Sequence, residues 1–82
     1  MVLTVRYFAA ARAAAGVDSV VVEVDEYATL GDVEALLSAD HPHLGPVLAR
    51  CSYLRDEIAV CDREVVLGPC ATLDVLPPFA GG

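Results

Sequence analysis

The last two residues of the chain, Gly81 and Gly82, are the ones best suited to chemistry. A terminal glycine presents an α-carboxylate that no side chain surrounds, and glycine accepts backbone angles that other residues avoid. An enzyme could therefore thread such an end through a narrow channel and modify its carboxylate. The alternative is an ordinary frayed terminus, because the last residues of many domains are disordered and carry no function.

The residues before the diglycine favour a chemical role for the terminal carboxylate over a frayed terminus. Positions 76–80 read Leu-Pro-Pro-Phe-Ala, and the two prolines favour the extended polyproline II conformation. Such a segment loses less entropy when a partner fixes it. At about 3.3 Å per residue, residues 77–82 would reach roughly 20 Å. We therefore expect these six residues to form an extended C-terminal tail on a single domain that spans residues 1–82.

Composition and charge exclude several classes of protein. Hydrophobic residues make up 56% of the chain, but no apolar run approaches the ~20 residues of a membrane helix. The first residues lack the features of a signal peptide, so we expect a cytoplasmic protein. The net charge is −7, all five cationic residues are arginine and lysine is absent. Nucleic acid is therefore an unsuitable partner. The acidity suits a partner with a basic docking region, or serves solubility alone.

The cysteines and histidines do not form a recognisable site. Cys51, Cys61 and Cys70 contain no C-x-x-C pair, so we expect three small core or strand residues without a bound metal. His41 and His43 flank a proline that splays their rings, and no third ligand is near in sequence. We expect them at a helix end and in a loop.

The carboxylates Asp25 and Glu26 are adjacent in sequence. We expect them to lie in a solvated loop rather than to form a paired-carboxylate site.

The tail must be positioned by the elements before it. Residues 2–8 are rich in β-branched and aromatic side chains and predict a strand. An alanine-rich helix is expected over residues 9–15, ended by Gly16, and a second strand over residues 17–24.

The main helix is predicted to begin at Thr29, where Asp32 completes a capping box. Apolar residues at positions 30, 33 and 37 have helical spacing. The helix should end near Asp40, because Pro42 cannot continue it. Residues 44–51 predict a short second helical piece.

The rest of the chain predicts three further strands. We expect them over residues 54–61, 64–67 and 72–76, with a turn at Asp62 and Arg63 between the first two. The prolines at positions 77 and 78 should end the last strand. The order predicts an α+β fold of the ubiquitin-like β-grasp type: a mixed five-stranded sheet, with parallel first and last strands, packed on one main helix.

Strand alternation predicts which side chains face a partner. Thr4, Arg6 and Phe8 share one face of the first strand, and Asp74 and Leu76 share one face of the last. The polar members make this the outer face, which leaves Phe8 and Leu76 as an apolar docking pair near the tail. The alternative is that a loop covers them.

Two segments carry a resemblance to a known family. Val-Arg-Tyr-Phe-Ala-Ala-Ala-Arg at residues 5–12 and Pro-Pro-Phe-Ala-Gly-Gly at residues 77–82 are similar to the two ends of molybdopterin synthase small subunits. These subunits are ubiquitin-like sulfur carriers, and the resemblance spans the whole chain. The chain departs from the family at Cys61-Asp62, where an asparagine is common, and at Ala71-Thr72, where Gly-Asp is common.

The resemblance implies a chemical route. An ATP-dependent activating enzyme would adenylate Gly82, and a sulfur donor would then convert it to a thiocarboxylate. A large synthase subunit would present this end, with Gly81 beside it, to a cyclic pterin phosphate. The chain itself would bind no cofactor or metal and would be a subunit of a sulfurtransferase rather than a catalyst alone. The residues expected to contact partner proteins are Phe8, Arg12, Leu76, Pro77, Pro78, Phe79 and Ala80.

Three other functions remain open. The same carrier chemistry could serve thiamine or cysteine synthesis. The chain could be a ubiquitin-like modifier attached through Gly82, although without lysine it could not build lysine-linked chains on itself. It could also be an interaction module whose diglycine has no role. Arg12 could bind a partner carboxylate or be solvated.

Overall fold

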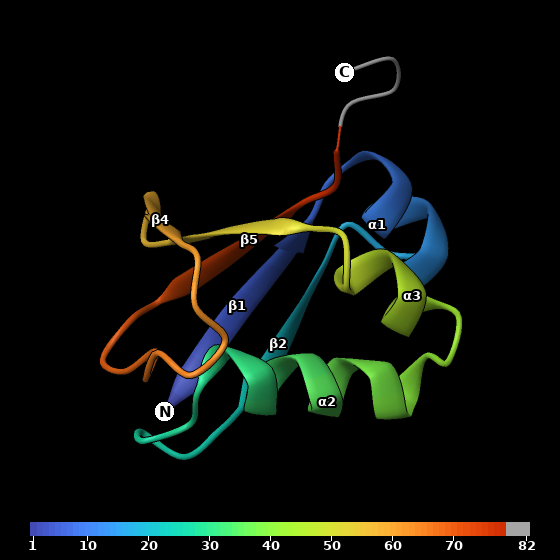
Figure 1. The fold of residues 1–82 in the computed structure, drawn as a ribbon. Helices are drawn as coiled ribbons and strands as arrows, with labels where there is room; N and C mark the ends of the chain where they lie inside the picture. Colours follow the sequence, from blue (N-terminus) through green and yellow to red (C-terminus); the bar gives the residue numbers. More distant parts are fainter. Residues whose placement is uncertain (79–82) are drawn as a thin grey trace.

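A five-stranded mixed sheet in the order β2-β1-β5-β3-β4 forms the framework of the computed structural model, which describes residues 1–78 (Figure 1). The strands are β1 (Val2–Tyr7), β2 (Ser19–Glu23), β3 (Ser52–Arg55), β4 (Ile58–Val60) and β5 (Thr72–Leu76). Strands β1 and β5 are parallel neighbours at the centre, and the other pairs are antiparallel. The predicted ubiquitin-like β-grasp, with its first and last strands side by side, is therefore confirmed.

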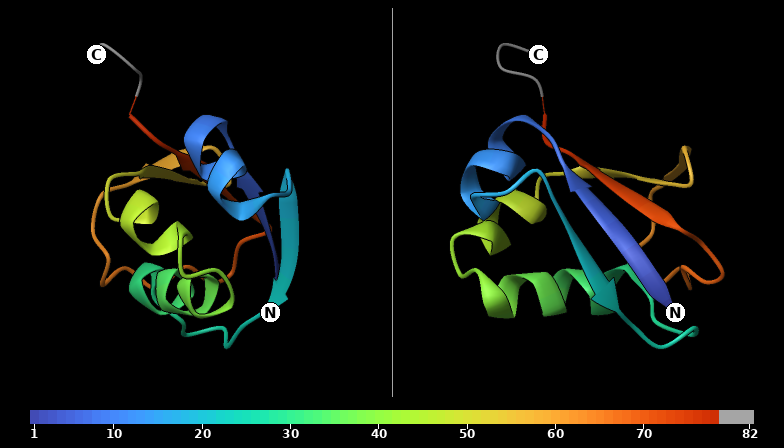
Figure 2. Two further views of the ribbon diagram at one scale, coloured as in Figure 1. Left: turned by 90° about the vertical axis from the view of Figure 1, so that its right-hand side faces the viewer. Right: turned by 180° about the vertical axis from the view of Figure 1, so that it is seen from behind.

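Three helices cover one face of this sheet: α1 (Ala9–Ala15), α2 (Leu30–Asp40) and α3 (Leu44–Leu48) (Figure 2). The predicted capping box starts α2: the Asp32 backbone N–H donates to Thr29 Oγ1 at 3.1 Å, and the Thr29 N–H donates to Asp32 Oδ2 at 3.0 Å. At the end of α1, Gly16 adopts a φ of 78°, a left-handed angle that glycine accepts without strain. None of the helices among residues 1–78 is long and apolar enough to cross a bilayer.

The core lies between the helices and the inner face of the sheet. Alternate residues of β1 and β5 point into it, and the helices contribute leucines and a valine. Its largest fully buried side chains are Leu3, Val5, Leu30, Val33, Leu44, Leu48, Leu67, Leu73 and Val75. The strand parity predicted for β1 and β5 is therefore correct.

The predicted third and fourth strands were wrong in their boundaries. Residues 52–60 form a β3–β4 hairpin that turns at Asp56 and Glu57, not at Asp62 and Arg63. The φ angles of the two turn residues are 45° and 73°. Turns with two positive φ angles usually contain asparagine or glycine, so the Asp-Glu sequence gives no turn signal.

The Asp56 side chain ties this turn to the segment before β5. Its Oδ1 accepts hydrogen bonds from the Ala71 N–H at 3.0 Å and from the Thr72 N–H at 2.9 Å. These backbone donors, that of Thr72 first, lower the pKa of the Asp56 carboxyl below its usual range. The turn therefore helps to align β5.

Residues 62–67, the strap, replace the predicted fourth strand. They form no strand, and only Val66 makes an isolated bridge, to Thr29. Arg63 fastens the strap to α2 through Glu34, with 2.8 Å between Nε and Oε1. The strap also passes so close to α2 that a Cβ added at Gly31 would lie 3.2 Å from the Arg63 carbonyl oxygen. The strap closes the core at the start of α2.

The prediction for the cysteines holds for two of the three. Cys51 and Cys70 are half-buried and pack against the core. Cys61 is exposed, because β4 ends at Val60 and the chain turns there into the strap.

Glu57→Gly should raise the free energy of unfolding by about 1 kcal/mol, because it relieves the cost of a left-handed backbone at a residue with a side chain. Urea denaturation followed by circular dichroism measures this. Glu64→Gly is the matched control: its φ is not positive, so this change should lower stability. Equal effects of both substitutions would contradict the assignment of strain to Glu57.

Candidate functional site

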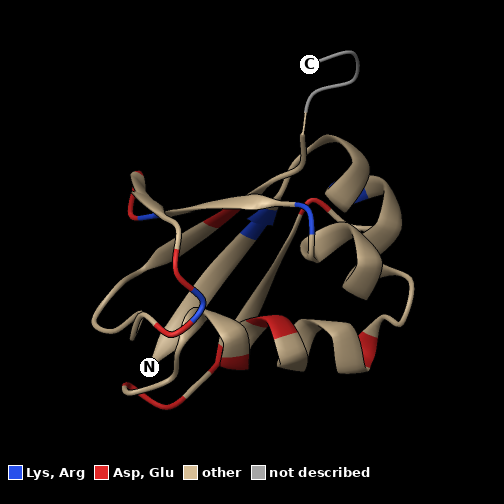
Figure 3. Cartoon of the chain, viewed as in Figure 1, with Lys and Arg blue, Asp and Glu red and all other residues tan. Residues whose placement is uncertain are grey.

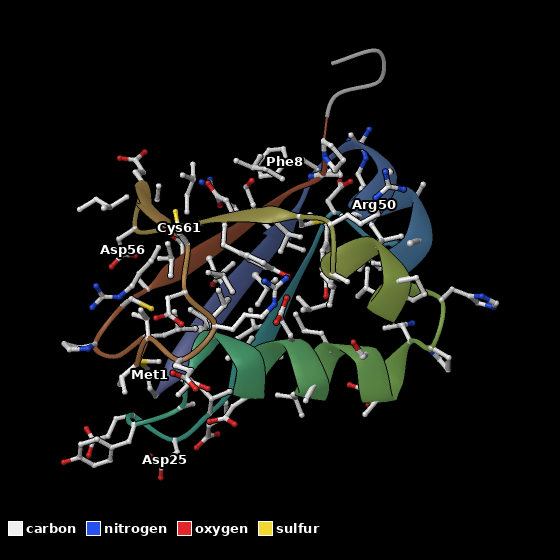
Figure 4. The ribbon with its side chains drawn as sticks, in the orientation of Figure 1. Met1, Phe8, Asp25, Arg50, Asp56 and Cys61 are labelled. Carbon is white, nitrogen blue, oxygen red and sulfur yellow. The ribbon has the colours of Figure 1, made fainter. Side chains whose placement is uncertain are left out.

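The candidate site lies where the two central strands end. Tyr7 and Val75 are the last register pair of β1 and β5, and the Phe8 N–H donates to the Val75 carbonyl at 3.2 Å. Figure 4 places Phe8 beside the end of the described chain. Beyond Leu76, Pro77 is buried and Pro78 is exposed. The tail therefore starts from the centre of the sheet.

The remaining tail residues predicted to act lie outside the described residues. These are Phe79, Ala80, Gly81 and Gly82. The chemical role of the diglycine stays a prediction.

The predicted apolar docking pair is unequally exposed. Phe8 is 40% exposed, in agreement with its expected outward position. Leu76 also lies on the outer face but is half-buried, and it pairs with Ser52 of β3. The sequence placed the start of β3 at residue 54 and so missed this neighbour.

An ion pair holds the outer face together next to Phe8. Arg6 Nε lies 2.5 Å from Asp74 Oδ1, and an Nη lies 2.7 Å from Oδ2, a bidentate arrangement across the parallel β1–β5 pair. Asp74 is only 5% exposed, with Leu54 opposite it on β3. The hydrogen bond and charge of Asp74 raise the pKa of Arg6. The Arg6 guanidinium also lies 6.0 Å from the centre of the Phe8 ring, within range of a cation–π contact.

The sequence analysis put Arg6 and Asp74 on the same face but missed that they form this pair. The signal was present, because opposite charges at outward positions of adjacent parallel strands can pair when the register aligns them. The register, Arg6 beside Asp74, became known only from the structure.

Arg12 lies on α1 and makes a loose contact. Its Nη1 is 3.6 Å from Asp18 Oδ1, and both side chains are mostly exposed. Exposed pairs of this kind contribute little to stability. Arg12 is thus accessible to a partner, and both roles considered for it remain open.

The histidines considered for metal binding and the two carboxylates considered as a paired site have the structural positions expected for them. His41 is the C-cap of α2 and His43 precedes α3, as expected. Asp25 and Glu26 are exposed in the loop before α2, where Asp25 Oδ1 accepts from the Tyr27 N–H at 2.7 Å. Within residues 1–78, no three His, Cys, Asp or Glu side chains are arranged to hold a metal ion. Figure 3 shows that acidic residues gather on α2 and the loop leading into it.

Comparison with known proteins agrees with this architecture. The model of the ThiS family matches residues 5–82, nearly the whole chain. The chain belongs to the ThiS family. With its β-grasp fold, this membership makes it a ubiquitin-like sulfur carrier. The sequence matched no curated protein.

Solved structures of similar proteins give the same fold. SAMP1, the small archaeal modifier protein 1 of Haloferax volcanii, is 29% identical with a TM-score of 0.81, and the match covers 100% of both chains. A Pyrococcus furiosus protein described as subunit 1 of a molybdopterin converting factor is 23% identical, with a TM-score of 0.83 over 96% of this chain and 99% of that one. One chain in the complex of subunits 1 and 2 of the molybdopterin-converting factor from Helicobacter pylori also matches. It is 18% identical with a TM-score of 0.72, and the match covers 100% of this chain and 100% of that one. The last two likenesses concern the fold alone.

Arg6→Met should destabilise this ThiS-family chain more than the double substitution Arg6→Met with Asp74→Leu. The single change leaves the Asp74 carboxylate buried without its partner, whereas the double change removes the charge as well. Urea denaturation midpoints of both variants and the wild type measure the order. Arg12→Met, which removes an exposed contact, should leave the midpoint almost unchanged. A double variant less stable than the Arg6→Met single variant would contradict this account.

Proposed function

We propose that the chain carries sulfur as a thiocarboxylate on Gly82 and acts as the small subunit of a molybdopterin synthase, donating the sulfur to a cyclic pterin phosphate. The observation that carries the proposal is the family match, which extends through Gly82. Two further observations are compatible with it: the fold shared with subunit 1 structures and the start of the tail at the end of a central strand.

The proposed route overcomes the low reactivity of a carboxylate. The activating enzyme joins the Gly82 carboxylate to AMP from ATP and releases pyrophosphate. A donor of sulfide-level sulfur (HS⁻) then attacks the acyl carbon, the C–O bond to AMP breaks, a C–S bond forms, and AMP leaves. The resulting thiocarboxylate is a nucleophile: its sulfur attacks a carbon of the cyclic pterin phosphate, forms a C–S bond and displaces an oxygen substituent from that carbon. Water then cleaves the acyl–sulfur bond, which leaves the sulfur on the substrate and restores the Gly82 carboxylate. Each carrier molecule delivers one sulfur in this way, so two carrier molecules supply the two sulfurs of a dithiolene.

The geometry suits delivery of this end to a buried centre. The tail begins at buried Pro77, which follows a central strand that is hydrogen-bonded on both sides. A rigid base and a restrained tail limit the entropy lost on insertion, because fewer conformers must be fixed. From this base the tail could extend its end by roughly 20 Å.

The partner surface in this proposal is the tail-side patch, defined as Phe8, Leu76 and Pro78. Phe8 and Pro78 are exposed and Leu76 is half-exposed. Arg6 borders the patch and is held in place by Asp74. A small apolar patch beside a charged rim is the usual arrangement of a protein interface. The large synthase subunit would bind here, as would the activating enzyme when it takes the same tail.

A second candidate is a protein modifier that is joined through Gly82 to amines of other proteins. The end-to-end likeness to SAMP1, at 29% identity, favours it. Both functions begin with the same activated glycine. They differ in the acceptor, because a modifier would appear in covalent conjugates and a synthase subunit would not.

Incubation with ATP, the activating enzyme and a sulfur donor should add about 16 Da to the intact chain, the exchange of one oxygen for sulfur at Gly82. Deletion of Gly82 should abolish the gain, because the new end falls about 3.3 Å short of the activating centre. Gly82→Ala keeps a carboxylate but adds a methyl group, so it should slow the reaction. Intact-protein mass spectrometry measures all three. Equal sulfur gain by the deletion variant would refute the assignment of Gly82.

Phe8→Asp should weaken binding to the large subunit by at least about tenfold, because it places a charge in the centre of an apolar contact. Isothermal titration calorimetry with the purified large subunit measures the affinity. Tyr27→Asp is the matched control, since Tyr27 is a 75% exposed aromatic residue in the loop before α2, far from the tail. Circular dichroism should report both variants as folded. Equal affinity of both variants would mean that the tail-side patch is not the docking surface.

A further inference from the structure

Strand β2 is an edge of the sheet without the usual protection. It has β1 on one side and no partner strand among residues 1–78 on the other. Its sequence, Ser-Val-Val-Val-Glu, contains neither lysine nor proline, two residues that commonly blunt an edge, and its one charged residue, Glu23, lies at the end of the strand. The opposite edge, β4, has only three residues and begins directly after the tight turn at Asp56 and Glu57. Strand β2 is thus the longer edge.

The hydrogen bonds to β1 fix which backbone groups of β2 are free. Met1 and Val24 exchange two bonds, with N···O distances of 2.7 and 2.9 Å, and the Tyr7 N–H donates to the Asp18 carbonyl at 2.8 Å. In an antiparallel pair such residues alternate. The backbone N–H and C=O groups of the even-numbered residues 18–24 therefore point to β1. The backbone N–H and C=O groups of Ser19, Val21 and Glu23 point away from β1, to the open edge.

The side chains of β2 leave apolar surface beside these groups. Val21 is 67% exposed on the outer face. Val20 and Val22 face the core but are only half-buried, because the core ends at this edge. A strand added along β2 would cover the valines on both faces.

We propose that β2 pairs with β2 of a second copy of the chain, antiparallel about a two-fold axis at Val21, to form one continuous sheet. In this register Val21 faces Val21, and Ser19 faces Glu23 of the other copy. The backbone groups of these residues point away from β1, so each pair can exchange two hydrogen bonds with the other copy. On the inner face, Val20 lies opposite Val22, and this extends the core of both copies.

The length of β2 and its charges together favour this register. A two-fold axis at Glu23 would set two carboxylates opposite each other, which is destabilising. An axis at Ser19 would leave Glu23 unpaired and run the ladder into the end of α1. With the axis at Val21, Asp18 faces Val24, and no acidic residue lies opposite another. The register at Val21 is therefore the one that pairs all five residues of β2 with each other and opposes no like charges.

The paired form is compatible with the proposed function, although it does not depend on it. The tail-side patch lies over β1 and β5, one strand or more inward from the edge. Both copies would keep their tails and patches accessible.

The expected affinity is low and depends on salt. One short strand pair buries less than the ~1,200 Å² of typical specific interfaces, which places it among transient contacts. Each copy carries a net charge of −7, so long-range repulsion opposes pairing, and screening by salt should strengthen it.

Sedimentation equilibrium on the whole chain under reducing conditions tests the proposal. We expect the 8.6 kDa monomer at about 10 µM and a growing dimer fraction towards about 1 mM, larger at high salt. The reductant prevents disulfides through exposed Cys61. A chain that stays monomeric at about 1 mM in high salt would overturn the proposal.

Two lysine variants locate the interface. Val21→Lys should weaken dimerisation by at least about tenfold, because lysine protects an edge. Ile58→Lys, at a 72% exposed residue of the other edge, makes the same change in net charge and should weaken nothing. Since both changes reduce the net negative charge, a general charge effect would strengthen dimerisation in both variants. Equal behaviour of the two would contradict pairing through β2.

Amide hydrogen exchange of the wild type gives an independent readout that needs no variant. The N–H groups of Ser19, Val21 and Glu23 should exchange more slowly as the protein concentration rises. Those of Val20 and Val22, already bonded to β1, should be protected at every concentration. Exchange at the three outward positions that does not change with concentration would refute the ladder.

Discussion

The parallel pairing of β1 with β5 is the constraint on which the rest of the molecule depends. It brings together residues 68 positions apart, as in the contact between Arg6 and Asp74. The same pairing aligns the inner residues of both strands over the helices. It also brings the C-terminal ends of both strands to the same end of the sheet. Phe8 and the base of the tail are therefore neighbours because the two central strands run in the same direction.

Local signals in the sequence predicted the elements that local interactions determine. The capping box at Thr29 and Asp32 and the proline at position 42 gave both ends of α2 correctly. Gly16 ended α1 as predicted. The β3–β4 hairpin was misplaced because its turn residues, Asp56 and Glu57, adopt positive φ angles in a turn that the Asp56 side chain ties to the segment before β5. A tertiary constraint of that kind leaves no mark on the turn sequence itself.

The candidate site was predictable to the extent that strand alternation determines it. Alternation placed Phe8 and Leu76 on the outer face, but it could not give the burial of Leu76, which depends on β3 lying next to β5. The ion pair of Arg6 with Asp74 likewise requires a register between strands at opposite ends of the sequence. What a single strand determines was foreseeable, and what two distant strands determine together was not.

The central position of β5 also has a consequence for the order of events during synthesis. The strand that completes the sheet is the last one made, and until it leaves the ribosome β1 and β3 both lack their inner neighbour. Contacts between such distant residues slow folding, because a long loop must close before they form. The residues that follow β5 are therefore joined to a complete sheet only after β5 has paired with both β1 and β3. An enzyme that grips the tail-side patch, built from both β1 and β5, would thereby select chains that have completed folding.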